Sequence, residues 1–162
     1  MLKVEWADAG PLPVPKAKEL ARLAEKVLRA ELLKPAKGST QKAVGNGAIA
    51  KPISGKPRFG AVNLVFCENA YIRDLNRRFR KLDKVTDVLS FIYGEEDVFG
   101  EIYIATAKAQ KQAPRWKNSF YDELRRLVVH GALHLAGFDH MNSKERQLMR
   151  AREDGYLKAN QR

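Results

Sequence analysis

The sequence predicts an α+β domain in which a small sheet of four strands packs against about five helices. Three observations predict this fold class. Short apolar runs of strand length are interspersed with segments whose apolar residues recur at helical spacing. The helical segments lie before, between and after the strand candidates. The chain has 162 residues, 44% of them hydrophobic and 30% charged, which suits a single domain spanning residues 1–162.

The first half of the chain contains two strand candidates and two helix candidates. Residues 2–6 alternate weakly and predict an edge strand, and residues 16–33 predict an amphipathic helix. Residues 61–67 predict a buried strand, which is followed by a helix over residues 69–80. The segment between them, at about 34–60, is rich in Gly, Pro, Lys, Ser and Ala. We predict a basic, flexible insertion there, with a loop that contacts RNA as the alternative.

The second half continues the alternation. Residues 87–93 and 101–106 predict two strands, and the turn residues at 94–100 predict a hairpin between them. A short helix is expected over residues 107–112. Two capping patterns then predict the starts of the last two helices, at Ser119 and at Asn142.

All three histidines of the chain lie in the eleven-residue segment from His130 to His140. On a helix, residues four apart share a face, so His130 and His134 can point at one atom. Gly137 can leave the helix with a positive φ, which allows His140 to return toward the first two. Three neutral imidazoles suit catalytic Zn²⁺, which takes three protein ligands and keeps one position for water. We therefore predict one zinc ion on the penultimate helix and the following loop, the alternative being histidines of the helix surface or core.

Two kinds of protein other than a zinc nuclease could have a zinc site of this type. The spacing matches the metzincin proteases, whose general base is a glutamate directly after the first histidine. Here that residue is Gly131, which we expect to let a bulky substrate approach the metal. The second rival is a non-catalytic protein that binds RNA or the ribosome and has a structural zinc. Cys67 would then be the fourth ligand, although a buried residue at a strand end is the simpler expectation for this cysteine.

The charge of the chain bears on its partners. Lys and Arg number 30 against 19 Asp and Glu, which gives a formal net charge of +11 and favours polyanions. One cysteine permits no internal disulfide and fits a reducing compartment. No apolar run is long enough to span a bilayer, and the N-terminus has no secretory signal pattern. We expect a cytoplasmic protein with no membrane partner and no small-molecule cofactor.

Three segments together resemble the YbeY endoribonuclease family of bacterial ribosomal-RNA maturation factors. They are residues 130–140, residues 75–91 with their Thr-Asp-Val-Leu-Ser-Phe motif, and residues 100–104. The resemblance extends over about residues 61–157. It implies a mixed sheet, cleavage of single-stranded RNA, processing of the 3′ end of small-subunit ribosomal RNA, and ribosome quality control. Its implied partners are ribosomal RNA and the ribosome.

The resemblance also assigns roles to residues. The zinc ligands fall on His130, His134 and His140, and the essential arginine of the family falls on Arg80. The metal would activate water or a ribose hydroxyl, and Arg80 would stabilise charge on the phosphoryl oxygens, so Arg80 and His130 are the candidate catalytic residues.

Asp139 is a candidate for the general base or for orienting a histidine. Candidates for binding the RNA backbone are Arg77, Arg78, Arg80, Lys81 and Lys84. Candidates for base stacking, with packing as the alternative, are Phe79, Tyr103 and Trp116.

Overall fold

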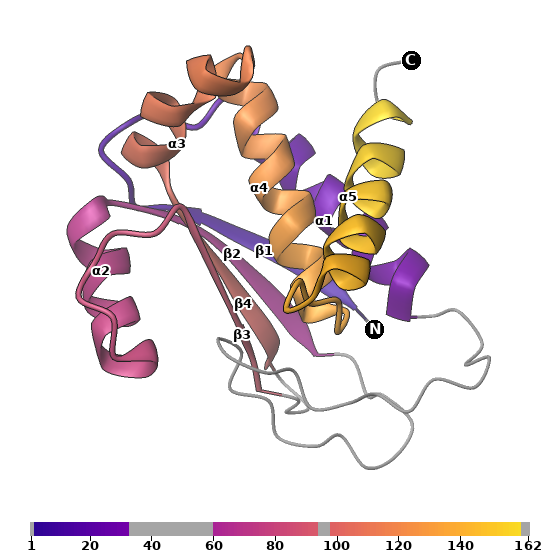
Figure 1. The fold of residues 1–162 in the computed structure, drawn as a ribbon. Coiled ribbons are helices and arrows are strands. Elements are labelled where there is room, and N and C mark those ends of the chain that lie inside the picture. Colours follow the sequence, from indigo (N-terminus) through magenta and orange to yellow (C-terminus); the bar gives the residue numbers. More distant parts are fainter. Residues whose placement is uncertain (1, 33–59, 94–97, 160–162) are drawn as a thin grey trace.

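The computed structural model describes residues 2–32, 60–93 and 98–159, and the expected insertion at about 34–60 therefore lies outside the described residues, apart from residue 60. Within these ranges the α+β fold is confirmed, with four strands and five α-helices (Figure 1). The elements are β1 (Lys3–Asp8), α1 (Ala17–Leu32), β2 (Ala61–Cys67), α2 (Asn69–Arg80), β3 (Val88–Ile92), β4 (Val98–Ala105), α3 (Thr106–Gln112), the 3₁₀-helix η1 (Ala113–Trp116), α4 (Phe120–Leu135) and α5 (Ser143–Lys158).

The sheet is mixed, with the strand order β1-β2-β4-β3. β2 pairs in parallel with β1 and with β4, whereas β3 and β4 run antiparallel, which confirms the hairpin and the edge position of β1. The prediction of a turn over residues 98–100 is wrong, because these residues already belong to β4. Val98 pairs with Ala61 of β2, and Gly100 pairs with Ile92 of β3, so pairing on both sides extends the strand.

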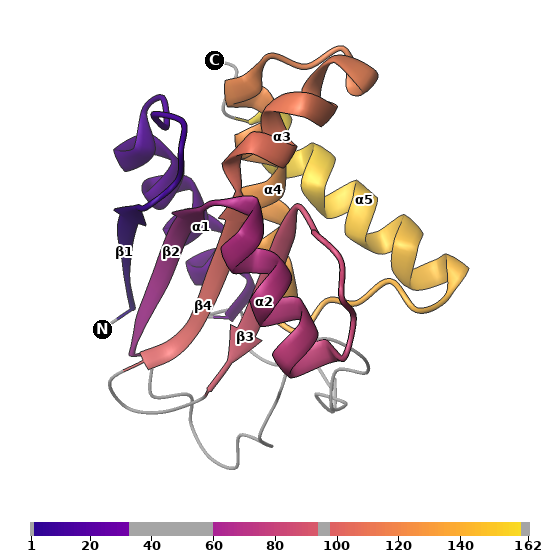
Figure 2. The same cartoon turned by 90° about the vertical axis from the view of Figure 1, so that its left-hand side faces the viewer.

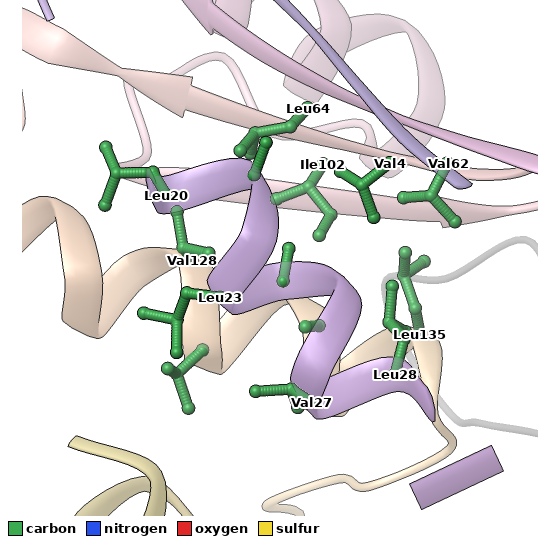
Figure 3. Packing of buried hydrophobic residues seen from close by; sticks show 14 of the residues in the cluster. Val4, Leu20, Leu23, Val27, Leu28, Val62, Leu64, Ile102, Val128 and Leu135 are labelled. Carbon is green, nitrogen blue, oxygen red and sulfur yellow. The ribbon is translucent and has the colours of Figure 1, made fainter. Parts of the chain in front are cut away.

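The helices form a layer on each face of the sheet. α1 and α4 cover one face, with α5 packed on α4, and α2 covers the other face (Figures 1 and 2). Side chains alternate along each strand, so Ile102 joins the core beneath α1 and α4 while its neighbour Tyr103 joins the core beneath α2. The larger core is shown in Figure 3, where the labelled residues are Val4, Leu20, Leu23, Val27, Leu28, Val62, Leu64, Ile102, Val128 and Leu135. Each fully buried Leu, Ile or Val contributes about 1.5–3 kcal/mol to stability.

α4 approaches the sheet closely at Gly131. The Ser90 hydroxyl donates to the Gly131 carbonyl at 3.2 Å, and a Cβ at position 131 would lie 2.6 Å from Cγ2 of Ile102. The expectation that Gly131 opens space for a substrate at the metal is therefore wrong. Position 131 lies about 100° around the helix from His130, and that direction faces the sheet.

Both predicted helix starts are confirmed. The Ser119 side chain accepts from the backbone N–H of Asp122 at 3.1 Å. At α5 the Asn142 side chain accepts from the N–H of Glu145, and the Glu145 carboxylate accepts from the N–H of Asn142, which completes a capping box. No helix in the described ranges combines the length and apolar character needed to cross a membrane.

Candidate metal centre

The three histidines converge at the C-terminal end of α4. His130 and His134 lie one turn apart on this helix, and His140 follows in the loop before α5. Each ring offers one nitrogen to a common point, and these ligand atoms all lie within 4.8 Å of one another. The Nε2 atoms of His130 and His134 are 3.0 Å apart. The predicted spatial grouping of the three imidazoles is therefore present in the fold.

A tight turn after α4 brings the third ring back. Gly137 has φ +92°, a conformation that glycine adopts without steric cost. The N–H of Phe138 donates to the carbonyl of Leu133, and the N–H of Gly137 donates to that of His134, both at 3.0 Å. These two bonds form a Schellman motif, which ends the helix and reverses the chain toward His140.

The chemistry of the three side chains suits a metal ion. Burial lowers the pKa of His134 to about 3, with repulsion from His130 and His140 acting in the same direction. His134 is therefore neutral at pH 7 and has a lone pair for coordination. Around a tetrahedral zinc with Zn–N of about 2.0–2.1 Å, two ligand nitrogens are roughly 3.3 Å apart. The 3.0 Å between the first two rings is close to that separation, so the donor set fits a small divalent cation.

Glu153 of α5 contacts the ligand set from outside. Its Oε1 lies 2.5 Å from Nδ1 of His130, the ring nitrogen that faces away from His134. Asp139, the carboxylate that the sequence offered for this purpose, instead accepts from the backbone N–H of His140 at 2.7 Å. Sequence reasoning missed Glu153 because it follows His130 by 23 residues and belongs to no recognisable spacing pattern.

A partly buried polar network supports α4 one turn before His130. Arg126 forms ion pairs with Glu123 at 2.7 Å and with Asp87 at 3.7 Å, and Gln112 donates to both carboxylates. Burial alone would raise the pKa of Glu123, but hydrogen bonds from Arg126, Asn118 and Gln112 outweigh it and lower the pKa. Asp87 directly precedes β3 and Gln112 ends α3, so this network joins α4 to the edge strand of the sheet and to α3.

Arg80 is the last residue of α2 and is partly buried. Among the described residues its guanidinium has no hydrogen-bond or ion-pair partner, the three histidines included. α2 and α4 lie on opposite faces of the sheet, yet both run toward the end at which β3 finishes and β4 begins (Figures 1 and 2). Their C-terminal ends therefore flank the edge strand β3 at one end of the molecule.

The other predicted RNA-binding cations follow the same helix end. Arg77 and Arg78 share the carboxylate of Asp74, at 2.6 and 3.3 Å. Lys81 has φ 59°, and its ammonium donates a hydrogen bond to the carbonyl of Arg78. Lys84 is exposed, and its ammonium has no partner in the described parts of the chain. One carboxylate thus balances two of these cations and leaves the helix end positively charged.

The three aromatic candidates have different environments. Tyr103 is 9% exposed and packs in the core beneath α2, as the packing alternative predicted. Phe79 is 46% exposed and makes an edge-to-face contact with Phe91 at 5.2 Å. Trp116, at the end of η1, is 66% exposed. Of these three candidates, Phe79 and Trp116 thus present an aromatic surface to solvent.

Cys67 is buried, as expected, and lies in the core beneath α2. Its thiol is 3.6 Å from the carbonyl of Ile104, and burial, with the charge of Glu68, raises its pKa to about 12. The histidines belong to the opposite face of the sheet. The idea of Cys67 as a fourth metal ligand is therefore wrong.

Comparison with known proteins bears on this site. A model of the family described as "Endoribonuclease YbeY" matches residues 17–161, which include all three histidines and Arg80. The chain belongs to the YbeY endoribonuclease family. An endoribonuclease YbeY of Desulforamulus reducens is 44% identical over 106 residues, covering 59% of this chain and 69% of that protein. One of Carboxydothermus hydrogenoformans is 38% identical over 115 residues, covering 69% and 80%.

A solved structure is similar to the whole fold. The solution structure of TM1509 from Thermotoga maritima superimposes with a TM-score of 0.53 and 28% sequence identity, covering 98% of this chain and 87% of that one. The mixed sheet and its helices are thus shared with another solved protein.

Proposed function

We propose that this chain is a zinc-dependent endoribonuclease that cleaves single-stranded RNA. The observation that carries the proposal is the convergence of His130, His134 and His140 in a chain of the YbeY endoribonuclease family. The formal net charge of +11 supports a polyanionic substrate, because basic side chains attract a phosphate backbone and release its counterions.

The three histidines and Arg80 have different proposed roles. The three histidines would hold the metal ion, and zinc bound by three protein ligands supplies a Lewis acid and acidifies water at its remaining position. Arg80 would bind the phosphate at the cleavage site and stabilise the negative charge that develops on its oxygens. Because Arg80 and the histidines flank β3, the RNA strand would cross this edge strand to reach both.

Single-stranded RNA suits the surface at the end of α2. The exposed ring of Phe79 has the guanidinium of Arg78 5.8 Å from its centre. An aromatic ring beside cations binds a strand whose bases are free to stack, which a duplex does not offer. The proposed contacts to the RNA backbone are Arg77, Arg78, Arg80, Lys81 and Lys84.

The rival functions have less support. A protease of the metzincin type needs a carboxylate after the first histidine, and position 131 faces the sheet without space even for a Cβ. A closed structural zinc site usually has a fourth protein ligand. In the described part of the chain, the group of candidate ligands contains the three histidines and no further Cys, Asp or Glu.

The proposed cellular role follows from family membership. We infer that the substrate is ribosomal RNA, with the 3′ end of small-subunit RNA as the processing site and ribosome quality control as a second task. The ribosome would then be the macromolecular partner. A cytoplasmic location is supported by the lone, buried, unpaired cysteine.

One experiment tests the proposed function. Metal content is measured on purified protein, which is then incubated with a labelled single-stranded RNA, the same RNA as a duplex, and casein. We expect about one zinc per chain, cleavage of the single strand, loss of cleavage on chelation and recovery on adding zinc. His134→Ala should lose both metal and cleavage. Bound zinc without RNA cleavage would favour a structural metal, and casein cleavage would favour a protease.

A further inference from the structure

We propose that Glu153 is a positioning residue of the metal centre, and that through it the docking of α5 is coupled to metal binding. Its carboxylate would hold the His130 ring in the tautomer and orientation that direct Nε2 at the metal. This inference rests on the proposed metal-dependent function, and it adds a residue that no spacing pattern in the sequence marks.

The contact separates the tasks of the two ring nitrogens. Nδ1 of His130 lies 2.5 Å from Oε1 of Glu153, while Nε2 lies 3.0 Å from Nε2 of His134. With the proton on Nδ1 and donated to the carboxylate, the lone pair is on Nε2 and faces the other ligands. The side chains of Glu153 and His130 are 14% and 21% exposed, so water competes little for this bond. A carboxylate that accepts from the second ring nitrogen fixes the orientation of a metal-binding histidine.

A cation lies near this carboxylate. Arg126, one turn before His130 on α4, is close enough to Glu153 for an attractive interaction between the charges. The other acidic residues of α5 have different surroundings. Glu145 belongs to the capping box, and Asp154 is exposed to solvent. Glu153 is therefore the carboxylate of α5 that faces the metal ligands.

The position of Glu153 depends on how α5 docks. Met149 is the one buried residue of this helix, and Tyr156 and Leu157 pack against the same core while partly exposed, so apolar burial contributes modestly to its docking. Polar contacts add to it near the C-terminal end, where the Tyr156 hydroxyl donates to Glu31 at 2.5 Å and Arg125 donates to the carbonyl of Leu157 at 2.9 Å. Because α5 buries little surface, one further hydrogen bond adds a substantial share of the free energy that holds it on the domain. The bond from His130 to Glu153 should be strongest when the metal holds the ring in one orientation, so metal binding should stabilise the docked helix.

The test compares Glu153→Ala and Glu153→Gln with Asp154→Asn, which removes the same charge from the neighbouring exposed position. Zinc affinity is measured by competition with a chromophoric chelator, and the absorption spectrum of the Co²⁺ form reports the coordination geometry. We expect Glu153→Ala to weaken zinc binding about 10–100-fold and to alter the cobalt spectrum. Glu153→Gln should lose less, because its amide oxygen still accepts from Nδ1, and Asp154→Asn should match the wild type.

Hydrogen exchange of the α5 amides supplies a second measurement. Zinc should increase their protection in the wild type and in Asp154→Asn, but not in Glu153→Ala. Unchanged zinc affinity and cobalt spectrum in both Glu153 variants would overturn the inference while leaving the proposed function intact. A wild-type protein that binds no zinc would instead overturn the proposed function. Glu153→Gln keeps the size of the side chain, so the comparison stands if Glu153→Ala does not fold.

Discussion

Replacing Gly131 with alanine tests how tightly the metal-bearing helix is fixed to the sheet. The new Cβ would lie 2.6 Å from Cγ2 of Ile102 and 3.2 Å from Oγ of Ser90. Carbon atoms in contact are about 3.5–4.0 Å apart, so the first distance is short by about 1 Å. Ile102 is fully buried, and its branched Cβ restricts rotation, so its methyl group has little freedom to yield. Overpacking of this kind costs about 1–3 kcal/mol, and we expect a value near the upper end.

Helix propensity acts in the opposite direction, by about 1 kcal/mol in favour of alanine. The expected net loss is therefore about 2 kcal/mol, or roughly 4–8 °C in Tm for a domain of this size. Gly155→Ala is a matched control, because this glycine lies in α5 with nothing within 4 Å of its Cβ. It should gain about 1 kcal/mol, so the difference between the two variants isolates the steric contact.

The assay is urea unfolding of wild type and both variants with a chelator present, because bound metal would stabilise the native state and mask the contact. A second measurement is zinc affinity, which should fall in Gly131→Ala since a displaced α4 carries His130 and His134 with it. If Gly131→Ala shifts the free energy of unfolding in the same direction and by the same amount as Gly155→Ala, the close approach of α4 to β4 is refuted.

Three further predictions concern other parts of the site. Arg80→Ala should keep its zinc but cleave single-stranded RNA about 10²–10³-fold more slowly, and unchanged turnover would remove Arg80 from the mechanism. Cys67→Ser should retain full zinc content, because the thiol lies across the sheet from the histidines. Loss of zinc would instead support a structural zinc site with Cys67 as its fourth ligand. Glu123→Gln should lose roughly 1–3 kcal/mol of unfolding free energy at pH 7, because Arg126 loses its charged partner. Because the pKa of Glu123 is lowered in the folded state, its charge stabilises the protein above about pH 4.5, and this stabilisation is lost as the pH falls below that value. The free energies of unfolding of variant and wild type should therefore converge when they are measured at decreasing pH.

Local patterns determined much of what the sequence could predict. The grouping of the three histidines followed from helical periodicity and from a glycine able to adopt φ +92°. The helix starts at Ser119 and Asn142 followed from side chains that cap their own helices. Each of these depends on residues within a few positions of one another, where chain geometry fixes the distance.

The boundaries of β4 and the environment of Gly131 were predicted wrongly for a shared reason. Residues 98–100 were grouped with the turn residues before them, but Val98 and Phe99 favour a strand, and pairing with β2 and β3 places all three residues in β4. Gly131 was interpreted from its place beside a ligand in the sequence, whereas its direction in space depends on which face of α4 meets the sheet. At both places the outcome depends on contacts between elements, which a local sequence pattern does not contain.

The sequence by itself therefore determined the type of most elements, the three histidines that could hold a metal ion, and a net positive charge that favours a polyanionic substrate. Tertiary structure alone decided that Glu153 contacts His130, that Arg126 pairs with Asp87, and that Cys67 lies on the far side of the sheet from the histidines. The physical reason is that the first two contacts join residues 23 and 39 positions apart, and only the packing of complete helices on a formed sheet sets those distances.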